Sequence, residues 1–490
     1  MRRRVRTSVA LFLAAWLASP TLAREALQPK LQQRVESILR EVGPGPRYGF
    51  VVATADGREL VAIAPDQRFI PASNTKIFTT AAAFAMLDGI HGPDAVGGAA
   101  VRLSVNETKV EDVILEGHGD ARLSSAANCA VDCLATLADA VAARTRVVRD
   151  IIGDDSFFPD ERWSPGMSWN NIQTGSGTAI SALTLDNNEL ALRVTPTAAG
   201  QAPDINLMPY YTVDNRAVTV VEGATDLRFE RLPGSAAARL SGTIAAGAPP
   251  EILGLGIDDP AHYAAWRFKS LLEARGVRVT GAILTRRRPL TPSDDPKMRA
   301  DAPPQRARQA EPLARLIPPP LGPSFAYLNK VSQNVHAELL LRRIGHQRGT
   351  GSIADGVAAI RAMLERAGVR RADYDFADGS GMSTYNRVAP RGMVVLLRWI
   401  AAKPWGRAWR ATLAVGGADG TLAKRFRGTP LEKQLFAKTG TLNASNALSG
   451  YMIAKSGRTL MFSTFANDVP EGVRASPAID AALELVAQAN

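Results

Sequence analysis

Cysteine and histidine are both scarce in this chain of 490 residues, which contains two cysteines and five histidines. Two cysteines are too few for a scaffold held together by disulfides. No histidine is spaced for shared coordination of a metal ion, so we expect no metal site. The chain also lacks a Gly-x-Ser-x-Gly elbow, which argues against a histidine-based serine triad. The five histidines are His91, His118, His262, His336 and His346.

Long apolar runs are absent as well, because no stretch of 18 consecutive apolar residues follows residue 23. Residues 1–23 are typical of a secretory signal peptide. They combine an arginine-rich start, an apolar core over 9–17, and the small residues Thr21 and Ala23 before a cleavage site. We expect an exported, soluble chain that begins near Arg24. A retained membrane anchor is the alternative, but the apolar core is shorter than the roughly 20 residues of a membrane span.

Composition places the chain among globular proteins. Hydrophobic residues make up 46% and charged residues 21%, which is too apolar for a disordered chain. The formal net charge is +11, but no basic stretch interleaved with aromatics forms a nucleic-acid-binding module, so we expect no nucleic acid partner. The length exceeds one ordinary domain, since single cores rarely grow beyond about 250–300 residues.

The two ends of the chain predict parts of one sheet covered by helices. Residues 48–64 have the turn and flanking apolar residues of a β-hairpin, and a helix follows over 73–87. Two strands, over 447–454 and 458–465, precede an amphipathic helix over 476–489.

The middle of the chain predicts a large insertion. Residues 100–190 mix short strands with a helix near 130–143, residues 190–255 are β-like, and a helix returns over 261–276. Residues 286–320, rich in Pro, Arg and Asp, indicate an exposed connection. The expected units are a signal peptide (1–23), a domain split between 24–92 and 312–490, an inserted α/β domain (93–190 and 255–290), a small β-rich inserted domain (191–254), and the connection over 286–320.

Cys129 and Cys133 are four residues apart and would lie on one face of a starting helix. An exported protein can keep a disulfide between them. Two small buried apolar residues explain the pair nearly as well, so both interpretations stay open.

One Ser-x-x-Lys occurs, at Ser73 and Lys76, at the start of a predicted helix. Their spacing places the hydroxyl and the amine on one helical face. The positive end of the helix favours negative charge at the serine, and a partly desolvated lysine loses its proton readily enough to act as a base. Alone, the pattern is expected by chance about once in such a chain.

Two further tripeptides, Ser-x-Asn and Lys-Thr/Ser-Gly, each occur more than once. Ser332-Gln333-Asn334 opens a predicted helix over 335–344, whereas Ser168–Asn170 has no helix to hold it. Lys438-Thr439-Gly440-Thr441 follows apolar residues in a predicted strand, whereas Lys455–Gly457 is predicted to be a hairpin turn. We expect the glycine Gly440 to let a ligand backbone lie against the strand.

The order Ser-x-x-Lys, Ser-x-Asn, Lys-Thr-Gly matches the active-site set of penicillin-binding proteins and serine β-lactamases. The chain resembles the class C, low-molecular-mass penicillin-binding proteins, the D-alanyl-D-alanine carboxypeptidase/endopeptidase family, over nearly all of residues 30–485. The 259 residues that separate Ser73 from Ser332 fit the large insertions of this family. Further resemblances are Gly117–Asp120, Gly153–Phe158, Trp169–Asn171 and Asp378–Ser383 with Asn386; His118 and Ala121 depart from the family pattern.

The resemblance implies an α/β (multi-domain) fold, with a serine β-lactamase/transpeptidase-like domain split by large β-rich inserted domains. It implies that Ser73 is the acyl nucleophile and that Lys76 takes its proton. Ser332 would relay a proton to the leaving amine, and Asn334 would position Lys76 and the substrate amide. Lys438 would shape the electrostatics of the site.

The same resemblance assigns the substrate carboxylate to Thr439 and Thr441, on either side of Gly440, and the oxyanion hole to the N–H groups of Ser73 and Thr441. It implies no cofactor, a periplasmic location, peptidoglycan stem peptides and cross-links as substrates, and β-lactam antibiotics as covalent inhibitors. The segment Asp378–Gly381 is weighed as a plain turn, and we assign it no catalysis.

Two alternatives remain. The first is a β-lactamase or D-amino-acid esterase that uses the same serine site, which the large insertion disfavours. The second is a non-catalytic wall-binding scaffold, which the intact Ser73, Lys76, Ser332, Asn334 and Lys438 argue against.

Overall fold

A computed structural model describes residues 27–87, 90–105, 110–299 and 311–490. The predicted signal peptide lies outside these residues. The two ends of the chain form one six-stranded sheet, in which β1 pairs with β22 along its whole length in antiparallel register. The mixed α/β fold class is confirmed. In spatial order the strands are β19 (Ala414–Val415), β20 (Leu435–Leu442), β21 (Ser445–Ile453), β22 (Thr459–Asn467), β1 (Arg47–Thr54) and β2 (Glu59–Ile63).

Helices cover both faces of this sheet, which explains why the side chains of its central strands are almost all buried. Alternate side chains of a strand point to opposite faces. In β1, Phe50 and Val52 enter the core beneath the terminal helices, whereas Val51 and Ala53 enter the larger core beneath the central helices. The terminal helices are α2 (Leu27–Arg40) and α11 (Ser476–Ala489); the central ones are α3 (Thr75–Met86), α6 (Gly322–Val331), α7 (Asn334–His346), α8 (Ile353–Arg366), α9 (Pro390–Ala401) and α10 (Gly406–Ala411).

A second sheet of five strands lies within the insertion and packs against two helices. Its strands β4 and β6 are parallel, and β15 continues this parallel arrangement at one edge. The strands in spatial order are β15 (Ile283–Arg288), β6 (Ile151–Pro159), β4 (Glu111–Glu116), β3 (Ala100–Val105) and β16 (Ala314–Arg315), and the helices are α4 (Leu134–Arg144) and α5 (Pro260–Glu273). β5 (Val147–Val148) and β14 (Arg278–Val279) form a short separate pair.

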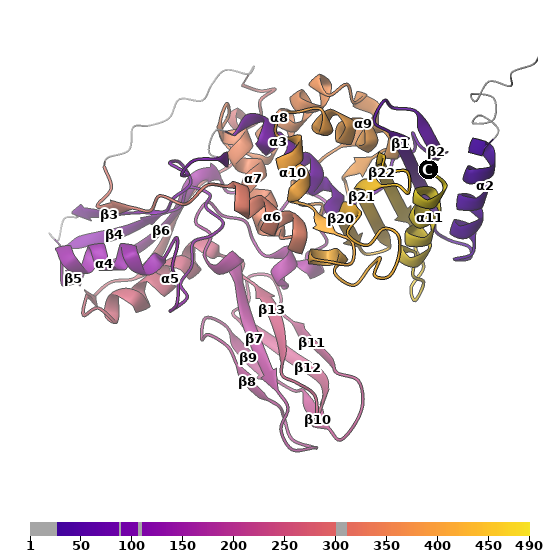
Figure 1. Cartoon of the computed structure of the whole chain (residues 1–490). Coiled ribbons are helices and arrows are strands. Elements are labelled where there is room, and N and C mark those ends of the chain that lie inside the picture. Colours follow the sequence, from indigo (N-terminus) through magenta and orange to yellow (C-terminus); the bar gives the residue numbers. More distant parts are fainter. Residues whose placement is uncertain (1–26, 88–89, 106–109, 300–310) are drawn as a thin grey trace, which may run out of the picture.

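A β-rich lobe projects from the body of the molecule (Figure 1). It contains a three-stranded sheet and a four-stranded sheet. The exposed and buried residues of β12 largely alternate, as expected for a strand with one solvated face. The strands are β7 (Glu189–Thr195), β8 (Asp204–Asn206) and β13 (Glu251–Gly256) in the first sheet, and β9 (Thr212–Asn215), β10 (Val218–Val220), β11 (Asp226–Glu230) and β12 (Ala237–Ala245) in the second.

The segment predicted as an exposed connection, 286–320, is more structured than expected. Its first residues complete β15, and Asp294 is buried and accepts a hydrogen bond of 2.7 Å from Arg288 Nη1. Residues 314–315 pair with β3 of the second sheet. The chain therefore re-enters the domain of the six-stranded sheet after residue 315, later than the predicted residue 312. Residues 300–310 lie outside the described part of the chain.

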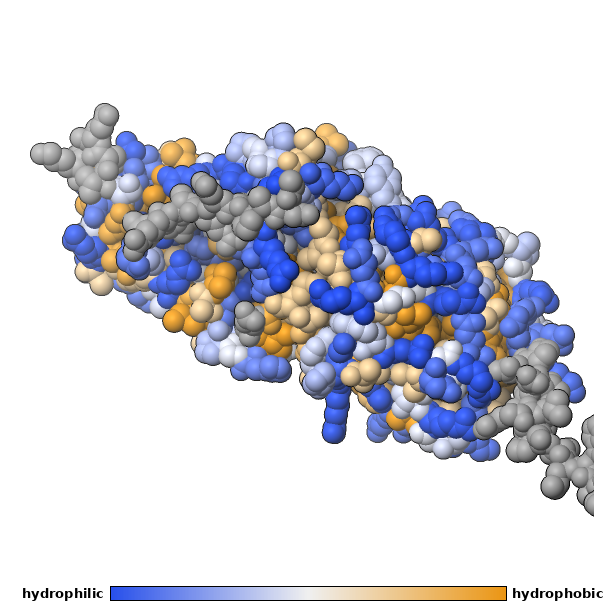
Figure 2. Space-filling view, turned by 90° about the horizontal axis from the view of Figure 1, so that it is seen from above, coloured by the Kyte–Doolittle hydropathy of each residue, from blue (hydrophilic) through white to orange (hydrophobic). Residues whose placement is uncertain are grey.

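The outer surface is consistent with a globular protein. Figure 2 shows hydrophilic side chains over most of the face seen from above, with apolar residues in small patches between them. None of the helices in the described segments is long and apolar enough to cross a membrane.

Cys129 and Cys133 are joined by a disulfide. Both precede α4, which begins at Leu134 with Cys133 as its N-cap residue, so the expectation that they share a helical face is wrong. The bond closes a local turn before α4, and no hydrogen bond within the described residues joins either cysteine to the three motifs.

We predict that replacing both cysteines with alanine preserves activity and lowers the free energy of unfolding modestly. A loop this short constrains the unfolded chain less than a 15-residue loop, for which the stabilisation is about 3 kcal/mol. Denaturant unfolding measures the change, and reduction of the unmodified protein should reproduce it. Loss of activity in a folded double variant would contradict this structural role.

Candidate active site

The Ser-x-x-Lys motif lies at the junction of a tight turn and a helix. Ser73 belongs to the 3-10 turn Ala72–Asn74, and Lys76 lies in the first turn of α3. The Lys76 side chain is fully buried, and its Nζ lies 2.9 Å from Ser73 Oγ. The predicted contact between hydroxyl and amine is therefore present.

Lys76 Nζ makes two further hydrogen bonds. One is to Asn334 Oδ1 at 2.6 Å, and the other is to the carbonyl of Ser380 at 2.7 Å. Burial disfavours the charged ammonium and lowers the pKa of Lys76 to about 7, although the nearby carboxylates of Asp378 and Glu338 act in the opposite direction. A substantial fraction of this amine is thus uncharged at neutral pH.

The Ser-x-Asn motif occupies the short connection between α6 and α7. Ser332 ends α6 in the left-handed conformation, with φ of 66°, and Gln333 caps α7 by accepting a hydrogen bond from the N–H of Val335. This geometry directs Ser332 Oγ to Lys438 Nζ, 2.9 Å away. Asn334 bridges Lys76 and the carbonyl of Ser176, to which its Nδ2 donates at 2.7 Å.

The Lys-Thr-Gly motif lies on β20. Lys438 is fully buried, and burial together with the charge of Lys76 lowers its pKa well below the usual range. Its neighbour Thr439 donates a hydrogen bond of 2.7 Å to the hydroxyl of Thr421. Thr441, two residues along the strand, is exposed.

Gly440 of β20 packs against the turn that carries Ser73. A Cβ at this position would lie 2.8 Å from the carbonyl oxygen of Pro71 and 3.1 Å from the nitrogen of Ser73. The missing side chain therefore makes room for the turn that carries the serine. This close approach brings the strand and the serine turn together.

Sequence reasoning missed the contribution of the glycine-rich segment that begins at Asp378. Glu338 Oε1 accepts hydrogen bonds from the N–H groups of Gly379 and Ser380 at 3.0 and 2.8 Å. These bonds hold the segment so that the Ser380 carbonyl faces Lys76. The sequence left open whether the segment is only a turn, and the structure places its Ser380 carbonyl against the buried lysine.

Asp378 is the buried anchor of the same segment. It accepts hydrogen bonds from the N–H groups of Gly381 and Ser383 and from Asn386 Nδ2. Burial, reinforced by Glu338, raises the pKa of Asp378 to about 6. In the sequence, the only sign of this segment is that Asp-Gly-Ser-Gly is followed by Asn386. That pattern does not reveal which residues the turn contacts.

The competing tripeptides lie elsewhere. Lys455–Gly457 forms part of the turn between β21 and β22, as predicted. Ser168–Asn170 leads into the 3-10 turn Trp169–Asn171, and among the described residues it makes no hydrogen bond to Lys76 or Lys438.

Two hollows meet at Asn334. One, of about 290 Å³, extends between the 162–180 segment, Glu338 and Ser380. The other, of about 580 Å³, is lined by Ser332 and Asn334 on one side and by residues of the insertion on the other. The Ser-x-Asn motif and the segment that begins at Asp378, which both contact the buried lysines, therefore border open space.

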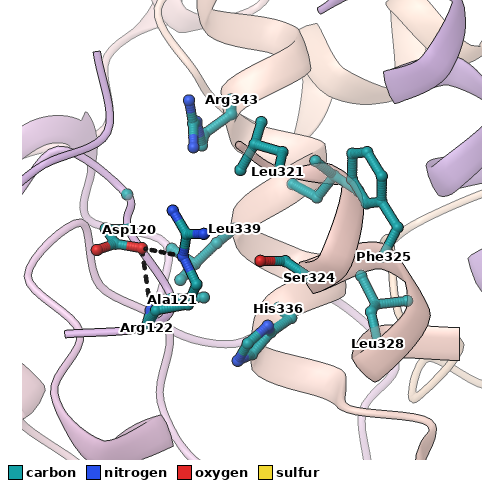
Figure 3. Close-up of a pocket in the computed structure, with 12 residues that line it drawn as sticks. Asp120, Ala121, Arg122, Leu321, Ser324, Phe325, Leu328, His336, Leu339 and Arg343 are labelled. Carbon is teal, nitrogen blue, oxygen red and sulfur yellow. Dashed lines mark hydrogen bonds and ion pairs between the residues drawn. The ribbon is translucent and has the colours of Figure 1, made fainter. Parts of the chain in front are cut away.

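A third hollow, of about 350 Å³, lies on another face of α7 (Figure 3). Two of its polar side chains, Arg122 and His336, are engaged within the protein. Arg122 bonds to Asp120 and to the carbonyls of Pro319 and Pro320, and His336 bonds to Asn187 Oδ1 at 2.9 Å. These contacts join the insertion to α6 and α7, and Ser73, Lys76 and Lys438 do not line the hollow.

Comparisons with known proteins agree with this geometry. The model of the D-Ala-D-Ala carboxypeptidase 3 (S13) family matches residues 31–489. A D-alanyl-D-alanine carboxypeptidase of an Actinomadura species is 34% identical over 473 residues, which cover 92% of this chain and 84% of that protein. D-alanyl-D-alanine carboxypeptidase DacB of Haemophilus influenzae is 24% identical and 89% of each chain is covered.

Solved structures show the same fold. The crystal structure of penicillin binding protein 4 (dacB) from Haemophilus influenzae superposes with a TM-score of 0.74 at 22% identity, covering 92% of this chain and 98% of that one. A second structure of that protein, complexed with a β-lactam, gives a TM-score of 0.69 at 20% identity, with coverage of 92% and 98%. The resemblance inferred from the three motifs is confirmed. This chain belongs to the D-Ala-D-Ala carboxypeptidase 3 (S13) family of serine peptidases.

Proposed function

We propose that this enzyme hydrolyses peptidoglycan stem peptides that end in D-Ala-D-Ala, and cross-links between such peptides, through an acyl-enzyme on Ser73. The contact between the buried Lys76 amine and Ser73 Oγ carries the proposal. A lysine with a pKa of about 7 is matched to proton abstraction at neutral pH.

In the first half of the reaction, uncharged Lys76 takes the proton of Ser73 as Oγ forms a bond with the scissile carbonyl carbon. The N–H groups of Ser73 and Thr441 stabilise the oxyanion. Ser332, which bonds to Lys438, relays a proton to the leaving amine as the carbon–nitrogen bond breaks. Asn334 holds Lys76 through its Oδ1.

In the second half, water attacks the ester carbon, and the carbon–oxygen bond to Ser73 breaks as the proton returns to Oγ. Thr439 and Thr441 bind the terminal carboxylate of the substrate before cleavage. Lys438, whose Nζ bonds to Ser332 Oγ, shapes the electrostatics of the site. Thr421 joins this set, because its hydroxyl already accepts a hydrogen bond from Thr439. No cofactor takes part in the proposed reaction.

The wider setting follows from the same proposal. The signal peptide predicted at 1–23 would direct the enzyme to the periplasm, where peptidoglycan is the substrate. We also propose the domain division predicted from the sequence, except that the chain re-enters the domain of the six-stranded sheet after Arg315. β-lactam antibiotics would acylate Ser73, because their strained amide and carboxylate imitate D-Ala-D-Ala.

We predict that penicillin labels Ser73. Mass spectrometry of a digest should find the penicilloyl increment on the peptide that carries Ser73, and Ser73→Ala should remove it. Lys76→Ala should slow labelling by roughly 10²–10⁴-fold, because a positioned general base is lost. Ser168→Ala, in the competing tripeptide, is the matched control and should label normally. A label on Ser332 or Ser380 would identify a different nucleophile.

We predict that acylation slows as the pH falls below about 7, because protonated Lys76 cannot accept the serine proton. Glu338 raises the pKa of Lys76, so Glu338→Gln should move this acidic limb to lower pH while its amide oxygen still accepts the two backbone hydrogen bonds. The rate of penicillin labelling against pH measures the shift, with the exposed Glu365→Gln as control. An unshifted limb in Glu338→Gln would contradict the assignment.

Digestion of purified peptidoglycan with the mature protein tests the proposed substrates. We expect release of D-alanine and cleavage of cross-linked muropeptides, both of which liquid chromatography separates. Rapid turnover of penicillin instead of a persistent adduct would favour a β-lactamase or esterase. Binding of muropeptides without hydrolysis would favour the non-catalytic scaffold.

A further inference from the structure

Residues 379–431 carry a strong excess of positive charge. They contain nine Arg or Lys residues and one acidic residue, Asp419. Within the described part of the chain, only Arg391 and Arg425 of these nine form an ion pair. The single acid is itself paired with Lys330, which lies outside the segment. Most of these cations therefore have no counter-charge in the protein, and the proposed mechanism uses none of them.

Four of the unpaired cations lie at the β19 edge of the six-stranded sheet, and we call them the basic edge. Two belong to α10, which leads into β19, and two belong to the loop between β19 and β20. They are Arg407 and Arg410 on the helix and Lys424 and Arg427 in the loop. All are exposed except Arg410, which is half-buried. In Figure 1, α6 and α7 lie between α10 and the second sheet, so the basic edge is a feature of the split domain and not of the insertion.

Arg410 shows most clearly that the basic edge lacks negative charge. Its guanidinium lies over the ring of Phe436, 4.1 Å from the centroid, and burial lowers its pKa below the usual range. The aromatic ring attracts the cation but does not neutralise it. A partly buried cation without a carboxylate partner is costly and gains from an anion that another molecule supplies.

The loop of the basic edge also reaches the cleft. Thr421 lies three residues before Lys424, and its hydroxyl accepts a hydrogen bond of 2.7 Å from Thr439. Arg427 is held against the same loop, because its Nε donates a hydrogen bond of 2.7 Å to the carbonyl of Ala423. In the proposed function these threonines hold the carboxylate of the leaving residue. A peptide that extends from that residue therefore leaves the cleft along this loop.

We propose that the basic edge is a subsite for the leaving peptide of a cross-link and binds the free carboxylates that this peptide carries. Arg and Lys side chains form charge-assisted hydrogen bonds with carboxylates. A single D-alanine offers no further anion, because its one carboxylate is already bound by the threonines. The basic edge thus favours cleavage of cross-links over removal of a terminal residue.

The subsite rests on the proposed function, because its ligand is one half of a cross-linked substrate. Two cross-linked muropeptide dimers test it. In the free dimer, all carboxylates of the leaving peptide are free; in the amidated dimer, all are amidated except the one next to the scissile bond. We expect the unmodified enzyme to cleave the free dimer with the higher kcat/KM. The difference should shrink as the salt concentration rises, because salt screens exposed charges.

A triple variant with Arg407→Gln, Lys424→Gln and Arg427→Gln identifies the residues responsible. Its kcat/KM for the free dimer should fall roughly 3- to 30-fold, the combined effect of three exposed ion pairs. Cleavage of the amidated dimer and of diacetyl-L-Lys-D-Ala-D-Ala should be unchanged, and so should labelling by penicillin. The matched control is Lys30→Gln with Arg34→Gln, which removes two exposed cations of α2 on the other face of the sheet and should alter neither dimer.

An anionic membrane surface is the other partner that exposed cations fit. The hydrogen bond between Thr421 and Thr439 favours the peptide, because it connects the loop to the cleft. Co-sedimentation with vesicles of phosphatidylglycerol and phosphatidylcholine separates the two partners. If the unmodified protein binds these vesicles, the triple variant does not, and both dimers are cleaved alike, the surface binds lipid and the peptide subsite is wrong.

Failure of the subsite and failure of the proposed function give different results. If the unmodified enzyme cleaves both dimers alike, or the triple variant slows both equally, the subsite is wrong and the function stands. If the unmodified enzyme cleaves neither dimer, the proposed cleavage of cross-links is wrong, and competition decides on the subsite. The free dimer must then slow penicillin labelling more than the amidated dimer does, and the triple variant must abolish the difference. Equal competition would overturn the subsite.

Discussion

The burial of the Lys76 side chain is the constraint on which the rest of the site depends. A charged ammonium out of contact with water is costly, and burial brings its pKa to about 7. Three oxygen atoms surround its nitrogen, from Ser73, Asn334 and Ser380. These partners come from three separate parts of the chain, so folding must bring all three together before the amine can act on the serine.

Close backbone packing makes that convergence possible. Gly440 lets β20 approach the serine turn, and Gly381 lets the Asp378 segment approach it from another side, since a Cβ there would lie 1.9 Å from the carbonyl oxygen of Ala72. Glu338 and Asp378 then fix the segment through its backbone N–H groups. Two buried carboxylates near a buried amine also keep its pKa from falling further.

The insertion contributes to the cleft as well as to the bulk of the molecule. The Ser176 carbonyl accepts a hydrogen bond from Asn334, and the hydrogen bond from the N–H of Gly256 to the carbonyl of Gln173 ties this same loop to β13. The lobe and the Ser-x-Asn motif are thus mechanically connected. Glu189 lines the hollow at this junction, together with Ser332 and Asn334.

Local sequence was sufficient to locate Ser73, Lys76 and the Lys-Thr-Gly strand, because helix starts and apolar strands carry short-range signals. It also separated the motif at Ser332 from the competing one at Ser168, since a helix follows the former. It misjudged the cysteine pair, because the position at which α4 begins depends on packing and not on spacing alone.

The sequence by itself determined the terminal hairpins, the helices that follow Ser73 and Asn334, and the three motifs that identify the family. Only the tertiary structure decided that the Asp378 segment contacts the lysine, that Gly440 serves the serine turn, and that Glu189 lines the cleft. The physical reason is that burial, pKa and close backbone contact depend on residues hundreds of positions apart. No local pattern encodes those contacts, whereas helix caps, turns and strand alternation are encoded within a few residues.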